Sequence, residues 1–105
     1  MSQFSVHRNP NSATKTAVPY LIDIQSDLMA ELGTRVVAPL YPVASMKGKI
    51  LKTLTPLFEI EGKKFVMMTP QLAGIQKGQL GAQVADLSAW RNEIIAALDL
   101  LITGI

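Results

Sequence analysis

The chain has no cysteine among its 105 residues, so disulfide bonds, thiolate metal sites and cysteine nucleophiles are excluded. Its one histidine, His7, has no serine or carboxylate at a spacing that marks a catalytic triad, and a single histidine cannot form a histidine metal cluster. We interpret His7 either as a residue whose ring nitrogens are satisfied by hydrogen bonds or as a surface residue. With no general acid and base to name, we expect a protein that is not an enzyme and that has no catalytic residue, no metal site and no cofactor.

Long hydrophobic runs are also missing. No stretch approaches the roughly 20 apolar residues of a membrane span, and the first 20 residues lack the apolar core of a signal peptide. We therefore expect a cytoplasmic protein without a membrane partner.

Charge is scarce: charged residues make up 17% of the chain, against roughly 25% in an average domain. Apolar residues make up 49%, and a chain this short buries only about two-thirds of the surface that its unfolded form exposes. The length indicates one domain, residues 1–105, with one core. The apolar surplus predicts that part of its surface closes against a second copy, in a homodimer.

Short alternating or β-branched segments between turn residues predict an antiparallel sheet. Glu61-Gly62 is a link of hairpin length, and Pro39 cannot donate a ladder hydrogen bond, so we expect its strand to end near an edge or bulge. Ser26 and Asp27 predict the cap of a short helical turn. Strands are expected at residues 3–7, 20–25, 34–40, 56–60 and 63–69, with one or two more within 70–82 and an irregular segment at 41–54.

The C-terminal segment is the clearest helix, because its apolar residues recur at spacings of three and four. Asp86 or Ser88 can cap it, and we expect Trp90 to pack into the core. The second half is apolar nearly all round, which predicts burial on more than one side. The whole pattern indicates a mainly β, α+β fold closed by this helix. The apolar face consists of Leu87, Trp90, Ile94, Leu98, Leu101 and Ile105.

Lysines gather in the middle of the chain. Lys47, Lys49 and Lys52 form the densest cluster, with Lys63 and Lys64 nearby. A solvated loop face is the ordinary interpretation, and contact with an acidic partner segment is the functional alternative.

Four segments resemble one known family. They are Tyr-Leu-Ile-Asp-Ile-Gln-Ser-Asp-Leu-Met (20–29) with Arg-Val-Val-Ala-Pro-Leu (35–40), the stretch from Val-Ala-Asp-Leu-Ser (84–88) to the C-terminal Thr-Gly-Ile, and, more weakly, Phe-Val-Met-Met-Thr (65–69). Together they are similar to the CcdB-type toxins of bacterial toxin–antitoxin pairs.

The resemblance implies an SH3-like antiparallel barrel or sheet, with a small accessory sheet and a C-terminal helix, which dimerises about a two-fold axis. It implies a toxin that binds the A subunit of DNA gyrase and traps gyrase on cleaved DNA, so that replication stops. A CcdA-like antitoxin with an acidic tail would neutralise the toxin. The two proteins together would repress their operon, so this chain would meet DNA only through the antitoxin complex.

Carried over residue by residue, the resemblance also implies a gyrase-binding site. Ordinary core packing is the alternative interpretation of Leu28, Met29 and Ile102. For the acidic tail of the antitoxin, we expect the basic residues Arg8, Lys47 and Lys49 to be the contacts. The gyrase-facing residues are Leu28, Met29, Asp99, Ile102, Thr103, Gly104 and Ile105.

Thr103 departs from the family pattern, because strong gyrase poisons often have Trp before the final Gly-Ile, where it can stack on an arginine of the target. Losing such a stacked ring costs on the order of 2 kcal/mol or more. Two alternatives therefore stay open. One is an endoribonuclease of the MazF type, which shares the CcdB architecture, and the other is a homologue that binds antitoxin but poisons nothing.

Overall fold

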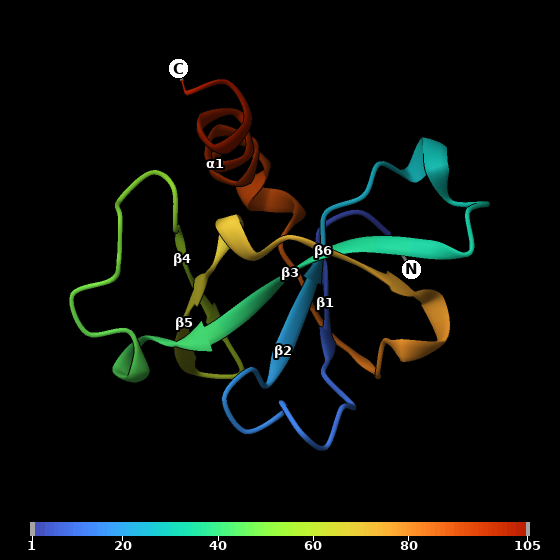
Figure 1. Ribbon diagram of the computed structural model, residues 1–105, viewed down its shortest axis with the longest axis horizontal. Coiled ribbons are helices and arrows are strands. Elements are labelled where there is room, and N and C mark those ends of the chain that lie inside the picture. Colours follow the sequence, from blue (N-terminus) through green and yellow to red (C-terminus); the bar gives the residue numbers. More distant parts are fainter. Residues whose placement is uncertain (1, 105) are drawn as a thin grey trace.

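The computed structural model describes residues 2–104, which fold into a curled antiparallel sheet with one α-helix (Figure 1). The strand order is β4-β5-β3-β2-β1-β7, and β6 pairs with β3 outside this row. The helix α1 (Arg91–Thr103) follows the last strand. The predicted α+β fold, with an antiparallel sheet and a C-terminal helix, is confirmed. The strands are β1 Ser5–Arg8, β2 Tyr20–Asp23, β3 Thr34–Pro42, β4 Leu57–Ile60, β5 Lys63–Met67, β6 Ala73–Gln76 and β7 Gln83–Asp86.

β3 is the long central strand, and it changes partner along one edge. Residues 34–37 pair with β6, which makes the small accessory sheet, and residues 40–42 pair with β5. Pro39 lies between these two stretches, inside the strand, which runs on to Pro42 and does not end at Leu40 as predicted. The N–H and C=O of one residue in an antiparallel strand point to the same side. Because the Pro39 carbonyl accepts from Met68 N at 3.0 Å, its missing N–H lies where neither partner strand needs it.

The predicted two-residue hairpin joins β4 to β5. Glu61 and Gly62 both have positive φ, +51° and +81°. This combination is that of a type I′ turn, whose twist matches the twist of the flanking strands.

Strand boundaries differ from the prediction in β1 and β7, which pair with each other at one end of the sheet. β1 begins at Ser5 rather than Gln3 because Phe4 has a φ of +70°, outside the extended region. The sequence did not predict β7, which pairs with β1 across a register shift between Val6 and His7.

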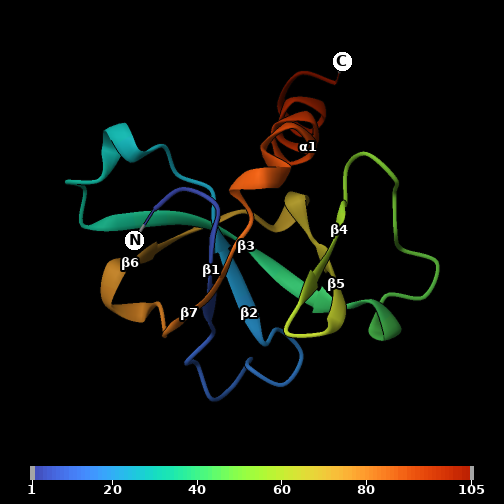
Figure 2. The ribbon, with the colours of Figure 1, turned by 180° about the vertical axis from the view of Figure 1, so that it is seen from behind.

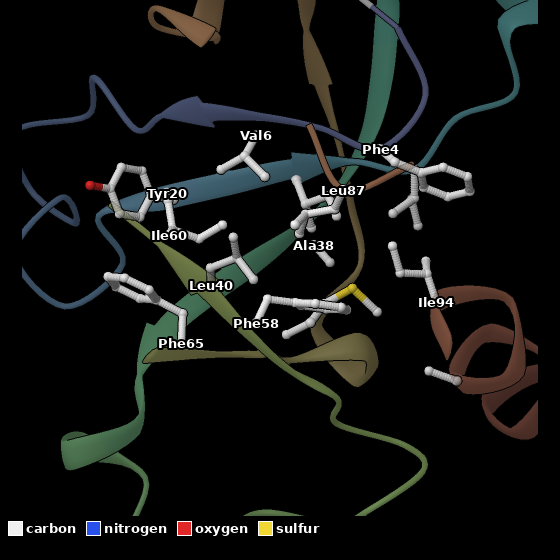
Figure 3. Packing of buried hydrophobic residues seen from close by; sticks show 14 residues of the cluster. Phe4, Val6, Tyr20, Ala38, Leu40, Phe58, Ile60, Phe65, Leu87 and Ile94 are labelled. Carbon is white, nitrogen blue, oxygen red and sulfur yellow. The ribbon is translucent and has the colours of Figure 1, made fainter. Parts of the chain in front are cut away.

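The core fills the inside of the curled sheet, and α1 covers one end of it with Ile94 (Figure 3). Leu87 and Ile94 are buried, as their spacing predicts. The α-helix begins only at Arg91, because residues 88–90 form a 3-10 turn, η5 (Ser88–Trp90). Trp90 is consequently 47% exposed, and the prediction that it packs into the core was wrong. Contrary to the prediction, Asp86 and Ser88 do not cap α1, because its N-cap position is Trp90; the Asp86 carboxylate instead accepts from Ser88 N at 2.8 Å, just before α1, at the start of η5.

Candidate functional site

The C-terminal end of α1 presents an apolar side chain to solvent. Ile102 is 75% exposed, and Asp99 and Thr103 beside it are exposed too. Thr103 Oγ1 donates to the Asp99 carbonyl at 2.6 Å. Gly104 ends the helix in the left-handed region, at a φ of +73°, and its N–H donates to the Leu100 carbonyl at 3.0 Å. The helix end is therefore ordered by its own hydrogen bonds and is not part of the core.

The short 3-10 turn η1 (Asp27–Met29) presents a second apolar tip. Ser26 caps it, as predicted, by accepting from Leu28 N at 3.2 Å. Leu28 is 92% exposed and Met29 is 52% exposed. Core packing, the alternative interpretation of Leu28, Met29 and Ile102, is therefore wrong.

A buried glutamine holds this turn against the sheet. Gln25 Nε2 donates to the Met29 carbonyl at 2.9 Å, and Gln25 Oε1 accepts from Val36 N at 3.0 Å. Gln25 is itself only 8% exposed. The side chain thus ties η1 to β3, and the exposed tip is carried on a fixed support.

An ion pair lies beneath Gln25. Arg35 Nε donates to Asp23 Oδ2 at 2.7 Å, and both side chains are at most 1% exposed. Asp23 Oδ1 also accepts from Gln25 N at 3.0 Å. The charges of Asp23 and Arg35 compensate each other, and the pair fixes the chain where β2 leads into η1.

The two apolar tips do not form one continuous surface within a single chain. In Figures 1 and 2, η1 and the C-terminal end of α1 lie on the same side of the sheet but well apart. Ile105, the last predicted gyrase-facing residue, lies outside the described residues.

Arg8, predicted to bind antitoxin, lies at the other end of the sheet in a clasp with Glu61 and Tyr20. Arg8 NH2 contacts both Glu61 oxygens, at 3.2 and 3.3 Å, and the Tyr20 hydroxyl donates to the same carboxylate. This hydrogen bond raises the pKa of Tyr20 above its ordinary value of 10.0. Burial and the charge of Glu61 act in the same direction, and Arg8 opposes them. The clasp joins the hairpin turn to β1 and β2.

Lys47 and Lys49, the other predicted antitoxin-binding residues, are exposed in the irregular segment after η2 (Val43–Ser45). Lys49 lines a depression together with Tyr41 and Met46. Pro42 lines both this depression and a neighbouring one that Tyr20 also lines. Arg8 stacks over the Tyr20 ring at 5.9 Å, so the structure brings Arg8 and Lys49 to one end of the sheet.

His7 is buried and hydrogen-bonded, so of the two predicted interpretations the hydrogen-bonded residue is confirmed and the surface residue is wrong. Its Nδ1 lies 3.0 Å from the Gly81 carbonyl, and its Nε2 lies 2.9 Å from Ser5 Oγ. Within residues 2–104, no three His, Asp or Glu side chains gather as a metal site requires. No helix in this part of the chain is long and apolar enough to cross a membrane.

Two comparisons with known proteins cover nearly the whole chain. A family model described as CcdB protein matches residues 3–104. The chain belongs to the CcdB family. Among solved structures, it is similar to an "Endoribonuclease in complex with its cognate antitoxin from Mycobacterial species", with a TM-score of 0.76 over 97% of this chain and 94% of that chain. At 11% sequence identity, this likeness shows that the two proteins share a fold.

Sequence reasoning missed two parts of the site in this CcdB family member. The first is the buried support of Asp23, Gln25 and Arg35, and the second is the clasp through Glu61. The clasp joins Arg8 and Glu61, which are 53 positions apart in the sequence, and the support joins Asp23 and Arg35 across two paired strands. The alternation of polar and apolar side chains in Leu-Ile-Asp-Ile-Gln (21–25) gave no signal of this buried support, because the pattern ordinarily places the polar side chains on the solvent face of a strand.

Proposed function

We propose that this CcdB family chain is the toxin of a toxin–antitoxin system and that it acts in the cytoplasm by binding the A subunit of DNA gyrase. The family match and the fold shared with a toxin–antitoxin endoribonuclease support a toxin of such a system. The observation that carries the gyrase proposal is Ile102, which is 75% exposed at the end of a helix that Gly104 closes.

A homodimer is part of the proposal. A two-fold axis would duplicate Ile102 and the η1 tip and so offer paired anchors to a symmetric target. Because the helix end and the Gln25-held turn are already ordered, binding them costs little conformational entropy.

The proposed action is poisoning by contact, without a chemical step of the toxin's own. Thr103 offers no ring to stack on a target arginine, so we expect binding weaker than that of relatives with Trp at this position. Its hydroxyl is engaged with the Asp99 carbonyl. Replacing Thr103 with Trp should therefore strengthen gyrase inhibition.

A supercoiling assay with purified gyrase tests the proposal. The wild-type protein at micromolar concentration should inhibit supercoiling and accumulate cleaved DNA, and deletion of residues 103–105 should abolish both effects. Absence of inhibition and cleavage with the wild-type protein would refute gyrase poisoning.

Gly104→Arg separates contact from folding. A Cβ at Gly104 meets no atom within 4 Å, so the arginine has room, and its positive φ costs about 1–2 kcal/mol. Gly104→Asn is the matched control, because asparagine tolerates this φ without the bulk or charge. We expect Arg but not Asn to abolish inhibition, with the Arg variant losing no more than this cost of about 1–2 kcal/mol in stability and the Asn variant losing less. A large loss of fold in either variant would mean that the tail is part of the core.

Neutralisation by a CcdA-like antitoxin completes the proposed function, with Arg8, Lys47 and Lys49 contacting its acidic tail. The complex would repress the operon, with DNA bound through the antitoxin. Co-expression of the small protein encoded beside this gene should restore growth of cells that express the toxin.

The similar structure is that of an endoribonuclease, which favours a second candidate function, cleavage of messenger RNA. Incubating the protein with RNA separates the two candidates, because RNA cleavage without gyrase inhibition would replace the first with the second. A protein that binds antitoxin but affects neither gyrase nor RNA would be the third possibility, a homologue that poisons nothing.

A further inference from the structure

Sulfur occurs in this chain only in methionine. There are five methionines and no cysteine, so no thiolate is present to react with an oxidant first. Met67 and Met46 are 0% and 6% exposed, and Met68 is half-buried. Met29 is 52% exposed, and within residues 2–104 it is the methionine most open to solvent. A small oxidant in solution therefore reaches the Met29 thioether before the others.

The surroundings of Met29 leave room for such an oxidant. Met29 lines a depression of about 440 Å³ that is formed by residues 27–32. The charged groups at this tip are Asp27, Glu31 and Lys77, whose Nζ donates to the carbonyl of Ala30. Hydrogen peroxide is small and uncharged, so these charges neither attract nor repel it.

The turn that carries Met29 is held by its backbone and not by the thioether. Met29 N donates to the Ser26 carbonyl at 3.0 Å. The Met29 carbonyl accepts from Gln25 Nε2 at 2.9 Å and from Leu32 N at 3.1 Å. Met29 is not a member of the buried core cluster. A chemical change at its sulfur therefore leaves these hydrogen bonds in place and disturbs no core contact.

Oxidation of Met29 would change the polarity of the whole tip. Leu28 and Leu32 are 92% and 51% exposed, so three apolar side chains share the segment that projects at the edge of the molecule in Figure 1. A sulfoxide is polar and accepts hydrogen bonds. A partner that closed over it would remove water from its oxygen without returning a hydrogen bond. The oxidised tip is thus a poorer docking surface on an unchanged fold.

We propose that Met29 is a reversible oxidation site through which a hydroperoxide switches off the apolar η1 tip. The sulfur lone pair attacks one oxygen of hydrogen peroxide, the O–O bond breaks, and that oxygen is transferred to sulfur. Its proton joins the leaving hydroxide, so the products are methionine sulfoxide and one water. Sulfur is oxidised by two electrons and the peroxide is reduced. Methionine sulfoxide reductases reverse the change, with two electrons from a thiol.

The consequence for gyrase rests on the proposed function, because it takes Met29 as a contact with the A subunit. The oxidation itself and the loss of apolar character do not depend on gyrase. They are therefore measured first, on the free protein.

Peptide mass spectrometry measures oxidation at each sulfur. The folded protein is exposed to millimolar hydrogen peroxide, quenched with catalase and digested with trypsin, which cuts after Lys and Arg. Arg35 and Lys47 then place Met29 and Met46 in separate peptides. We expect Met29 to oxidise about tenfold faster than Met46 and several-fold faster than Met68, and the three rates to converge in urea. Equal rates at Met29 and Met68 in the folded protein would overturn the inference.

Hydrophobic-interaction chromatography reports the polarity of the tip without gyrase. The oxidised wild type should elute earlier than the untreated protein, and the reductases for both sulfoxide epimers should restore its retention. Met29→Leu, which is apolar but has no sulfur, should elute unchanged after peroxide, whereas Met68→Leu should shift as the wild type does. The melting temperature of the oxidised protein should stay close to that of the untreated one. Unchanged retention, or a large fall in melting temperature, would contradict a switch confined to the tip.

The supercoiling assay adds the consequence for the partner. Oxidation should weaken inhibition by the wild type about tenfold, and reduction should restore it. In Met29→Leu, peroxide should change inhibition less than about twofold relative to the untreated variant. Inhibition that survives oxidation of Met29 would overturn the inference and leave the proposed function standing. An untreated wild type that leaves gyrase active would refute gyrase poisoning, while the oxidation rates and the retention would still decide whether Met29 is the oxidation site.

Discussion

Asp23 and Arg35 carry opposite charges inside the protein, 2.7 Å apart and almost without solvent contact. Replacing Asp23 with Ala would leave the Arg35 guanidinium buried and uncompensated, which costs roughly 3–5 kcal/mol. We therefore expect Asp23→Ala to lower the free energy of unfolding by that amount in urea titrations. The double variant Asp23→Leu with Arg35→Met removes both charges and should be much closer to the wild type. A loss below about 1 kcal/mol in the single variant would mean that water reaches the Arg35 guanidinium and solvates its charge.

Tyr20 gives a second test at a single residue, through its titration. Its pKa is raised above 10.0 mainly because the hydroxyl donates to Glu61, so the folded state favours the neutral phenol. The resulting stabilisation is complete below pH 10 and is lost as the pH rises through the raised pKa. Ultraviolet titration in a Tyr41→Phe background, which leaves Tyr20 as the one tyrosine, should show phenolate appearing above pH 10. Glu61→Gln should lower the midpoint, and an unchanged midpoint would contradict the clasp.

At the scale of elements, the sequence predicted what depends on neighbouring residues. Glu61-Gly62 specified the hairpin because a two-residue link with glycine adopts the required positive φ, and Ser26 specified the cap of η1. β7 was not predicted because its pairing partner, β1, lies about 80 positions earlier in the sequence. Trp90 was misplaced because the periodic pattern runs through η5 without a signal that the chain is not yet α-helical there.

In the candidate site, too, some residues could be predicted from the sequence and others could not. Leu28 and Ile102 were predicted as site residues through resemblance to a family. The sequence left open whether they are exposed or packed in the core, and only the structure shows that they are exposed. Gln25 and Arg35 were missed as supports, because only the folded chain brings them together across β2 and β3.

The junction between β7 and η5 offers an element-scale prediction. Two hydrogen bonds from Ser88 lower the pKa of Asp86 from its ordinary 3.8, so the carboxylate is favoured in the folded state. Its stabilisation is present above about pH 4 and is lost as the pH falls through the lowered pKa. Asp86→Ala should cost about 0.5 kcal/mol at neutral pH, a small value because solvent screens this exposed carboxylate, and the difference from the wild type should vanish in strong acid. Thermal unfolding at several pH values measures both, and a difference that persists in acid would exclude the carboxylate as the cause.

For the whole molecule, the question is what covers its apolar surface. The apolar surplus of the sequence led to the prediction of a homodimer. The structure is consistent with it, because α1 buries Ile94 and Ala97 against its own sheet and leaves its other apolar residues half-buried or exposed. Larger exposed side chains lie on several elements, and a folded monomer rarely leaves so much apolar surface open without a function for it. Those that are exposed within the described residues are Leu28, Met29, Leu32, Val36, Leu51, Leu57, Trp90 and Ile102.

We therefore expect sedimentation equilibrium at micromolar concentration to give twice the chain mass of 11.4 kDa. Deleting residues 103–105 should leave this mass unchanged if the tail serves the target and not the dimer, which is the division that the exposed helix end and the buried core of α1 imply. A truncated chain that sediments as a monomer would place the tail in the dimer interface, and its loss of gyrase inhibition would then follow from lost symmetry instead of lost contact. A wild-type mass of 11.4 kDa would remove the two-fold axis altogether and with it the paired presentation of Ile102 to a symmetric target.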